Sequence, residues 1–235
     1  MRVSIITPLY NQEEYIAETI ESALAQTYKD VEIIVVNDAS TDGSLAVAQK
    51  YADRVKIVSN PVNRGLPATR NIAISHATGD LILPLDSDDK IDPQYLEKTV
   101  ALMTDGVGVV ATWMWVEPVA DMLSKGHSRA ALGAPGSGWP IYAPTKQQIL
   151  HGNSIPVCSL IRRKALEETG GYDETFYDGA EDWGLWCGIV SLGTWSIRVL
   201  PEYLFHYRVH AKSMCRSVNM CSITARREQL RKKYE

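Results

Sequence analysis

The first ninety residues alternate between short apolar runs and segments with the spacing of an amphipathic helix. The apolar runs predict buried strands at 3–7, 31–36, 55–58 and 81–85, and the helical patterns lie near 12–26, 45–52 and 66–76. Asn11 and Glu14, spaced as in a capping box, are expected to begin the first helix. Strands that alternate with helices in this way form a parallel sheet, so the chain is predicted to be an α/β protein.

The pattern after residue 90 is less regular. Helices are expected at 93–104, 163–169 and 181–192, and strands at 107–116, 157–161, 195–199 and 203–209. Residues 117–144 concentrate Gly and Pro near their middle and are expected to be irregular. A loop of that length in a compact domain is usually functional.

An acidic cluster follows the apolar run Leu81–Leu85, as Asp86-Ser87-Asp88-Asp89. Carboxylates repel one another, so three of them at the end of a strand favour a compensating cation. Oxygen ligands with no Cys or His pair nearby suit Mg²⁺ or Mn²⁺ better than Zn²⁺. The alternative is a solvated acidic turn before the helix expected near Pro93, and this stretch alone leaves both open.

Polar residues also follow the other predicted parallel strands. Thr7 and Pro8 end the first, Asp38 follows the second, and Asp86 begins the acidic cluster after the fourth. Because crossovers are right-handed, the carboxyl ends of these strands meet at one edge of the sheet, where open α/β sheets bind ligands. The sequence therefore predicts a nucleotide and metal site at this edge.

A second acidic pair, Glu181 and Asp182, opens the helix expected at 181–192. Acids in the first turn of a helix complement its dipole, which is the simpler interpretation. A general base held ionised by that dipole is the functional alternative. His206 and His210 lie on one face of the last strand, and a distant histidine can complete a metal site begun by carboxylates.

Composition narrows the class of protein. A net charge of −4 argues against a nucleic-acid binder, which normally has a basic surface. The pattern of the first strand begins at Val3, so no signal peptide is expected. No apolar run approaches the roughly 20 residues of a membrane span. The cysteines form no C-x-x-C pair and are interpreted as reduced and mostly buried, as in a cytoplasmic chain: Cys158, Cys187, Cys215 and Cys221.

The basic stretch from Arg226 to Lys233 has two interpretations. A solvated terminal helix is the simpler one. The alternative is peripheral attachment to anionic lipid headgroups, which would hold a cytoplasmic protein at the inner face of the membrane.

An ordered set of motifs resembles the family 2 glycosyltransferases with the GT-A fold. The motifs are VSIITPLYN from Val3, VVNDASTDGS from Val35, GLPATRN from Gly65, LDSDD from Leu85, GGYDE from Gly170, EDW from Glu181 and YRVH from Tyr207. Each motif is weak alone, but their order and spacing over residues 1–215 are specific. The likeness lapses in 117–156, where acceptor-binding segments of such enzymes vary, and after Cys215.

The resemblance implies a GT-A fold, which is a Rossmann-like three-layer α/β sandwich around a mixed, mostly parallel sheet. It implies one domain over 1–215, with a nucleotide-binding half at 1–90 and an acceptor-binding half at 91–215. The basic tail 216–235 would follow it as a helix. The implied activity is metal-assisted transfer of a sugar, with inversion, from a nucleotide diphosphate sugar to an acceptor hydroxyl. UDP is the implied nucleotide, and the acceptor is a glycan, a lipid-linked sugar or a protein.

The family's motifs also imply which residues bind the donor. The corresponding nucleotide-sugar contacts are Thr7, Pro8, Tyr10, Asn11, Asp38, Arg70, Asp86, Ser87 and Asp88. Asp86 and Asp88 are implied to be the acids of the D-x-D motif, with Asp88 on a Mn²⁺ or Mg²⁺ ion. Asp89 is a second candidate for that metal, because the sequence offers three acids where the motif needs two.

The family also implies that Asp182 is the catalytic base, with Glu181 as a secondary candidate. His210 is implied to complete the metal shell, and His206 is its rival. The chemistry fits this division. A sugar nucleotide already carries a good leaving group, so the charge on its phosphate needs a cation and the attacking hydroxyl needs one base. A glycoside hydrolase would instead need two carboxyls that flank one bond.

Two alternatives stay open, a non-catalytic sugar-nucleotide-binding subunit and a sugar nucleotidyltransferase. A nucleotidyltransferase is expected to have a Gly-rich basic loop near the first strand, and Pro8-Leu9-Tyr10-Asn11 is not such a loop. The same residues exclude the G-x-G-x-x-G motif of dinucleotide enzymes at this position, and no P-loop motif occurs. The joint presence of Asp86, Asp88, Asp182 and His210 favours an active enzyme over a binding subunit.

Overall fold

The computed structural model describes residues 1–118, 137–176, 179–210 and 220–235. The strands are β1 Val3–Leu9, β2 Val31–Asn37, β3 Lys56–Ser59, β4 Leu81–Pro84, β5 Lys90–Ile91, β6 Val107–Pro118, β7 Ser137–Trp139, β8 Leu160–Arg162 and β9 Ser196–Val209. In the described chain they form one nine-stranded sheet in the order β3-β2-β1-β4-β8-β6-β9-β5, with β7 paired to β6. The longer pairings, β1 with β2 and β4, β2 with β3, and β6 with β9, are parallel, and the short pairings of β5, β7 and β8 are antiparallel.

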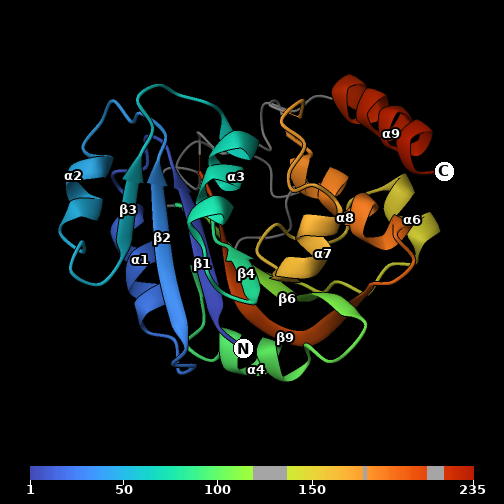
Figure 1. Ribbon diagram of the computed structural model, residues 1–235, viewed down its shortest axis with the longest axis horizontal. Helices are drawn as coiled ribbons and strands as arrows, with labels where there is room; N and C mark the ends of the chain where they lie inside the picture. The colour runs from blue at the N-terminus through green and yellow to red at the C-terminus, as the bar shows by residue number, and fades with distance from the viewer. Residues whose placement is uncertain (119–136, 177–178, 211–219) are drawn as a thin grey trace.

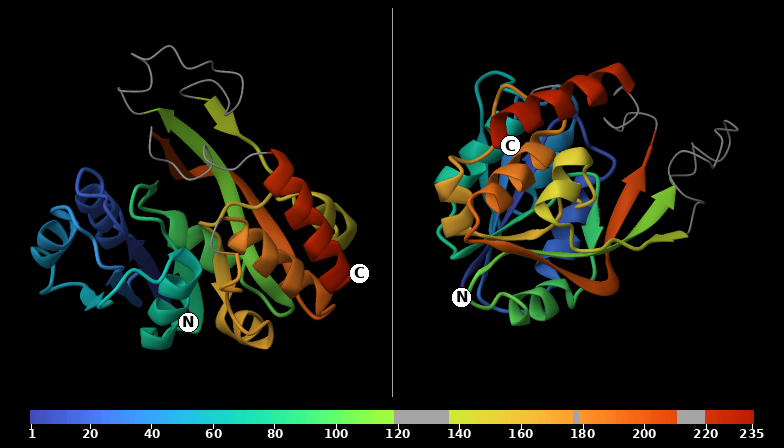
Figure 2. Two further views of the ribbon diagram at one scale, coloured as in Figure 1. Left: turned by 90° about the horizontal axis from the view of Figure 1, so that it is seen from above. Right: turned by 90° about the vertical axis from the view of Figure 1, so that its right-hand side faces the viewer.

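Helices cover both faces of this sheet (Figure 1). They are α1 Ile16–Leu24, α2 Ser44–Gln49, α3 Leu66–His76, α4 Tyr95–Ala101, α6 Lys146–His151, α7 Arg163–Glu168, α8 Glu181–Ser191 and α9 Met220–Tyr234. Successive side chains of β1 point to opposite faces of the sheet, so they pack in two different cores. Ile5 packs in the core under α1 and α4, whereas Ile6 packs in the core under α3, α7 and α8. The expected three-layer sandwich with a mixed, mostly parallel sheet is confirmed, and Figure 2 shows its layers from two further sides.

The elements expected in the first ninety residues are confirmed, with α3 at its predicted bounds. The predicted capping box at Asn11 and Glu14 is wrong. Asn11 has a positive φ of 52°, and its side-chain oxygen accepts a hydrogen bond of 2.8 Å from the Thr41 amide. Since Asn11 binds the loop after β2, the helix begins only at Ile16.

The last strand was expected in two pieces, and this expectation is wrong. β9 is continuous from Ser196 to Val209, although Pro201 lacks an amide proton. Its register against β6 shifts between Thr112 and Trp113, which pair with Leu200 and Tyr203. Such a bulge accommodates a proline without ending the strand.

The expectation that residues 117–144 are irregular is wrong for part of the described residues. β6 extends to Pro118, and Ser137–Trp139 form β7, whereas 119–136 lie outside the described residues. Gly138 allows this pairing, because a Cβ at that position would clash with the ring of Tyr203. Helix α6 was not predicted, although Thr145 and Gln148 form a capping box that the sequence displays.

Helix α9 confirms the helical part of the predicted tail, and 216–219 lie outside the described residues. Cys158 and Cys187 are buried and free, as expected, while Cys215 and the side chain of Cys221 are not described. Within the described ranges, no helix has the length and apolarity needed to cross a membrane.

Candidate active site

A cavity of about 480 Å³ with several charged residues in its lining lies at the carboxyl ends of β1, β2 and β4, where the sequence predicted a site. We call it the central cavity. The predicted site residues that line it are Pro8, Tyr10, Asp38, Arg70, Asp86, Ser87, Asp88, Glu181 and Asp182. They come from five separate segments of the chain, which the parallel strand order brings to one edge of the sheet.

The backbone around the central cavity is unusual at three turns. Among the described residues, the non-glycine residues with positive φ are Asn11 after β1, Ala39 after β2 and Ala180 before α8. The left-handed conformation is unfavourable for alanine, and strained positions of this kind concentrate at functional sites. Ala180 sets the direction in which α8 begins, and therefore where Glu181 and Asp182 lie.

Arg70, on α3, is fully buried and joins the two acidic segments of the cavity. Its Nη2 donates to Asp86 Oδ1 at 2.6 Å, and its Nη1 donates to Glu181. Its guanidinium also lies 5.4 Å from the centre of the Tyr172 ring. Burial opposes a charge here, but Asp86 and Glu181 raise the pKa of Arg70 well above its usual value. Arg70 therefore stays charged and holds α3, β4 and α8 together.

Asp88 and Asp89 of the acidic cluster lie in different environments. Asp88 Oδ2 lies 2.8 Å from His210 Nε2 and accepts a hydrogen bond of 3.5 Å from the side-chain amide of Gln12. Asp89 is 1% exposed and accepts from the Arg208 amide at 2.8 Å, so it joins the turn to β9 and does not line the central cavity. Burial, with the charges of Asp88 and Asp86, raises the pKa of Asp89 well above its usual value.

The two candidate histidines lie in different surroundings. His210 is 3% exposed, contacts Asp88 and stacks on the Tyr15 ring at 4.9 Å. His206 Nδ1 lies 2.8 Å from Glu117, which also forms an ion pair with Lys90. The structure thus brings His210, and not His206, to the acidic cluster.

Two predicted nucleotide contacts lie outside the cavity lining. Thr7 is 1% exposed within β1, and Asn11 binds the loop after β2. Asp38 does line the cavity. Its carboxylate accepts from the amides of Arg64 and Gly65, at 2.9 and 3.0 Å, and from the Asn60 side chain. Asp38 therefore fixes the loop between β3 and α3.

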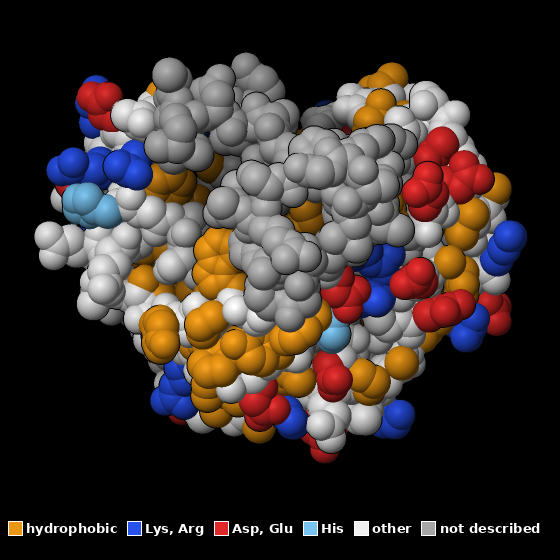
Figure 3. Space-filling view, turned by 180° about the vertical axis from the view of Figure 1, so that it is seen from behind, with side chains coloured by type: hydrophobic (Ala, Val, Ile, Leu, Met, Phe, Trp, Pro, Cys, Tyr) orange, Lys and Arg blue, Asp and Glu red, His pale blue; other side chains and the backbone are white. Residues whose placement is uncertain are grey.

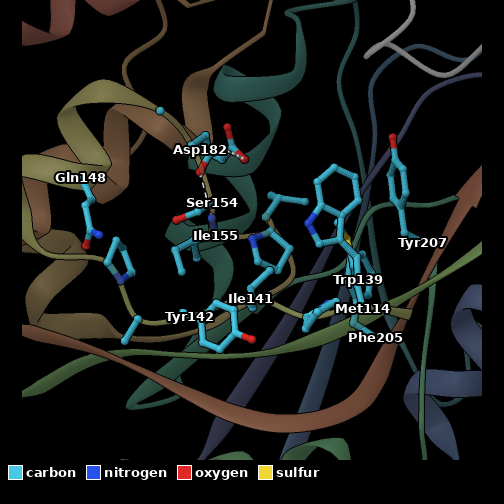
Figure 4. A pocket seen from close by; sticks show the side chains of 17 residues that line it. Met114, Trp139, Ile141, Tyr142, Gln148, Ser154, Ile155, Asp182, Phe205 and Tyr207 are labelled. Atoms are coloured by element: carbon cyan, nitrogen blue, oxygen red, sulfur yellow. Dashed lines mark hydrogen bonds between the residues drawn. The ribbon is translucent and has the colours of Figure 1, made fainter. Parts of the chain in front are cut away.

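A second, mainly apolar cavity of about 580 Å³ adjoins the first, and Asp182, Val157 and Tyr207 line both. We call it the apolar cavity. Figure 4 shows the rings of Trp139 and Tyr142 lining it, with Asp182 at one edge. The side chain of Trp139 is 45% exposed. Figure 3 shows the face of the molecule opposite to that of Figure 1, where apolar side chains gather.

Asp182 is held at the junction of the two cavities by Asn153, whose Nδ2 donates to Asp182 Oδ2 at 2.9 Å. The other carboxylate oxygen accepts from the Trp183 amide at 2.6 Å. Burial, and then the negative charge of Glu181, raises the pKa of Asp182 to about 7. A carboxyl group with this pKa is matched to proton transfer near neutral pH.

Several lining residues were not identified from the sequence. Gln12, Asn63 and Thr69 line the central cavity, and Val157 and Tyr207 line both. Tyr207 belongs to the YRVH motif, but strand alternation was expected to direct it away from the histidine face. The motif itself was the signal that could have identified it.

Comparison with known proteins decides the family. The model for "Glycosyl transferase family 2" matches residues 4–170. The chain belongs to glycosyl transferase family 2. The family's GT-A fold is confirmed by Staphylococcus aureus TarS, residues 1–349, whose crystal structure is 25% identical with a TM-score of 0.70. That match covers 88% of this chain and 60% of the 1–349 chain of TarS.

This family 2 chain is also similar to named relatives. "Putative glycosyltransferase EpsE" of Bacillus subtilis is 48% identical over 43% of this chain and 38% of its own length. The Escherichia coli "UDP-Glc:alpha-D-GlcNAc-diphosphoundecaprenol beta-1,3-glucosyltransferase WfaP" is 32% identical over 90% of this chain and 79% of its own length. The chain therefore spans less than half of EpsE and most of WfaP.

We expect the Arg70→Met variant to lose about 3–5 kcal/mol in free energy of unfolding, because Asp86 and Glu181 would keep buried charges without their partner. Urea unfolding at neutral pH measures this loss. The control is Arg2→Ala, whose ion pair with Glu32 involves an Arg side chain that is 47% exposed. This control should lose at most about 1 kcal/mol. Equal losses in the two variants would contradict the assigned role of Arg70.

Proposed function

We propose that this protein transfers a sugar, with inversion, from a nucleotide diphosphate sugar to an acceptor hydroxyl, with Asp182 as the general base. The observation that carries the proposal is the position of Asp182. Its carboxylate lines both the central cavity and the aromatic apolar cavity. A base that takes the proton of an acceptor must reach donor and acceptor together, and this junction offers such a position.

The central cavity is suited to the donor. Tyr10, 46% exposed, offers a ring for a nucleobase, and Asp38 and Asn63 add polar groups to the lining of the same cavity. Asp86, Ser87 and Asp88 lie at the carboxyl end of β4, where α/β sheets bind nucleotides. UDP is the proposed nucleotide, and the name of WfaP, which includes UDP-Glc as its donor, supports this choice.

A divalent ion is proposed at Asp88 and His210. Among the described residues, no three His, Cys, Asp or Glu side chains gather as a complete metal site. The 2.8 Å contact between Asp88 Oδ2 and His210 Nε2 nevertheless offers an oxygen and a nitrogen ligand side by side. Mn²⁺ or Mg²⁺ bound to nucleotides takes few protein ligands and completes its shell with phosphate oxygens and water. When bound, the ion would neutralise charge on the leaving diphosphate.

The proposed reaction is a single displacement. Asp182 accepts the proton of the acceptor hydroxyl, and the hydroxyl oxygen forms a bond to the anomeric carbon. The bond from this carbon to the diphosphate breaks on the opposite face, which inverts the configuration. Asn153 and the Trp183 amide orient the carboxylate, while Arg70 and Glu181 hold the first turn of α8 in place.

The apolar cavity is proposed to hold the acceptor. Aromatic rings such as those of Trp139 and Tyr142 stack on the apolar faces of sugars, and both rings are substantially exposed. WfaP, by its name, acts on a sugar linked through diphosphate to undecaprenol, and this supports a lipid-linked acceptor. A free glycan and a protein glycan are the other acceptors predicted from the sequence.

Peripheral membrane association stays a prediction from the sequence. Helix α9 carries the basic residues, but Arg231, Lys232 and Lys233 form ion pairs with Glu235, Glu228 and Asp173. These pairs weaken the attraction to anionic lipid that the basic composition implies. The cytoplasmic location likewise stays a prediction.

We predict that Asp182→Asn leaves the affinity for UDP nearly unchanged and lowers turnover by a factor of about 10²–10⁴. Calorimetry with UDP and Mn²⁺ measures affinity, and hydrolysis of a panel of UDP-sugars measures turnover. Asp105→Asn, at an exposed acid outside both cavities, is the control and should behave as the native protein. Native turnover in Asp182→Asn would exclude Asp182 as the base.

The same assignment predicts the pH dependence of the native enzyme. Asp182 must be ionised to accept a proton, and its pKa is raised to about 7. We therefore expect kcat/KM to fall about tenfold for each pH unit below about 7 and to level off above it. A flat profile between pH 5 and 8 would contradict this role.

We predict that Asp88→Ala abolishes Mn²⁺-dependent binding of UDP while the protein stays folded, because Asp88 is a rim carboxylate. Calorimetry with and without Mn²⁺ measures binding, and circular dichroism checks the fold. Asp53→Ala, at an exposed acid near α2, is the matched control and should bind UDP normally. Unfolding of Asp88→Ala would mean that the acid is structural.

For the acceptor cavity, we predict that Trp139→Ala raises the acceptor KM about tenfold and changes the donor KM less than twofold, because a stacked ring contributes about 1 kcal/mol or more. The measurement is transfer to a panel of neutral and lipid-linked sugars. Leu192→Ala removes an exposed apolar side chain outside both cavities and serves as the control. If only the donor KM rose in Trp139→Ala, the acceptor would have to bind outside the apolar cavity.

A further inference from the structure

Helix α9 follows the part of the chain matched by the family model and lies beside α6 and α8 (Figures 1 and 2). The contact is apolar. Leu230 is fully buried, and Tyr234 packs against the same core, which also contains Leu150 of α6 and Trp183 of α8. From Thr224 to Tyr234, where its side chains are described, a mostly polar helix is thus attached to the domain through Leu230 and Tyr234.

The surface of α8 beneath this edge is formed by two glycines one helical turn apart. A Cβ placed on Gly184 would lie 3.7 Å from Leu230, and one on Gly188 would lie 3.3 Å from the Tyr234 hydroxyl. Leu230 and Tyr234 are also four residues apart, so the two helices match turn by turn. The distance at Gly184 is an ordinary van der Waals contact, whereas at Gly188 a side chain would crowd both Tyr234 and Thr169, so the missing side chain matters at Gly188.

Helix α9 also contacts the segment that leads into α8. Lys233 Nζ donates to Asp173 Oδ2 at 2.9 Å, and the Arg226 guanidinium lies 4.8 Å from the Phe176 ring. Both partners precede the strained turn at Ala180. Helix α9 therefore contacts both α8 and the segment that precedes it, which contains Asp173 and Phe176.

On its other side, α9 packs on α6, whose end carries the partner of Asp182. Trp183 Nε1 donates to the Ile149 carbonyl of α6 at 2.5 Å, and Asn153 follows α6 and donates to Asp182. The relative position of α6 and α8 thus sets the contact between Asn153 and Asp182. Helix α9 lies across both helices.

We infer that Leu230 and Tyr234 are positioning residues, through which α9 holds α8 and α6 in the arrangement that places Asp182 between the two cavities. The inference rests on the proposed function for the role of Asp182. It assigns to the C-terminal helix a part in catalysis without any contact to substrate. Asp38 is held by Asn60, Arg64 and Gly65, and Asp88 lies against His210, and none of these partners belongs to α9. We therefore expect donor binding at these two acids to depend less on α9 than the position of Asp182 does.

The test compares Leu230→Ala with Leu230→Met, which keeps an apolar side chain of similar volume, and with Arg227→Ala on the exposed side of α9. Leu230→Ala is expected to lower kcat for UDP-sugar hydrolysis at least tenfold while the donor KM changes less than twofold. Leu230→Met should retain most of the native turnover, and Arg227→Ala should have the kcat and donor KM of the native protein.

Amide hydrogen exchange gives a second readout that does not depend on activity. In Leu230→Ala, exchange should rise in residues 180–187 as well as in α9, while residues 84–89 keep their native protection. Faster exchange in α9 alone, an unchanged kcat, or a donor KM that rises as much as kcat falls would each overturn the inference. If Leu230→Ala does not fold, Tyr234→Ala takes its place with the same expected pattern.

The two hypotheses fail in different ways. If Asp182→Asn retains native turnover, the proposed base is wrong, and the positioning role inferred for α9 is overturned with it. If Asp182→Asn is inactive but Leu230→Ala has native kcat and native exchange in 180–187, the proposed function stands and the role of α9 is overturned.

Discussion

The buried charge of Arg70 is the interaction on which the site depends. A guanidinium removed from water is unfavourable unless acids surround it, and here one acid comes from the end of β4 and the other from the start of α8. The arrangement therefore forms only when α3, β4 and α8 are all in place. Burial raises the pKa of Asp86, and the adjacent Arg70 opposes that rise. The geometry of the site therefore depends on the packing of these three elements against one another.

Around this centre the protein separates two environments. The central cavity is lined by carboxylates, amides and a basic group, whereas the apolar cavity is lined mainly by aromatic and aliphatic side chains. Asp182 stands at their boundary, partly desolvated and next to Glu181. Burial and the charge of Glu181 explain its raised pKa, and groups with such shifts concentrate at functional sites. Helix α8, which carries Asp182, packs against α6 and α9.

The regular part of the fold was predictable because it depends on local pattern. Short apolar runs bounded by turn residues favour buried strands. Gly65 and Pro67 mark the start of α3 and Gly79 follows its end, so α3 was predicted at its observed bounds. The acids at the end of β4 and Asp38 after β2 could be assigned to one edge, because parallel strands end together. Predictions failed where tertiary contacts override local preference. Asn11 binds a loop instead of capping α1, and β9 continues through Pro201 because a bulge against β6 accommodates it.

The sequence by itself determined the order of strands and helices and the family to which their motifs belong, because residue type and spacing suffice for both. Only the tertiary structure decided the surroundings of each acid. Asp88, Asp89 and Asp182 are chemically alike in the sequence, yet one meets His210, one is enclosed beside Arg208, and one lies between two cavities. Burial makes these differences together with long-range contacts, such as those of Asp88 with His210 and of Asp89 with Arg208, which the order of residues alone does not reveal.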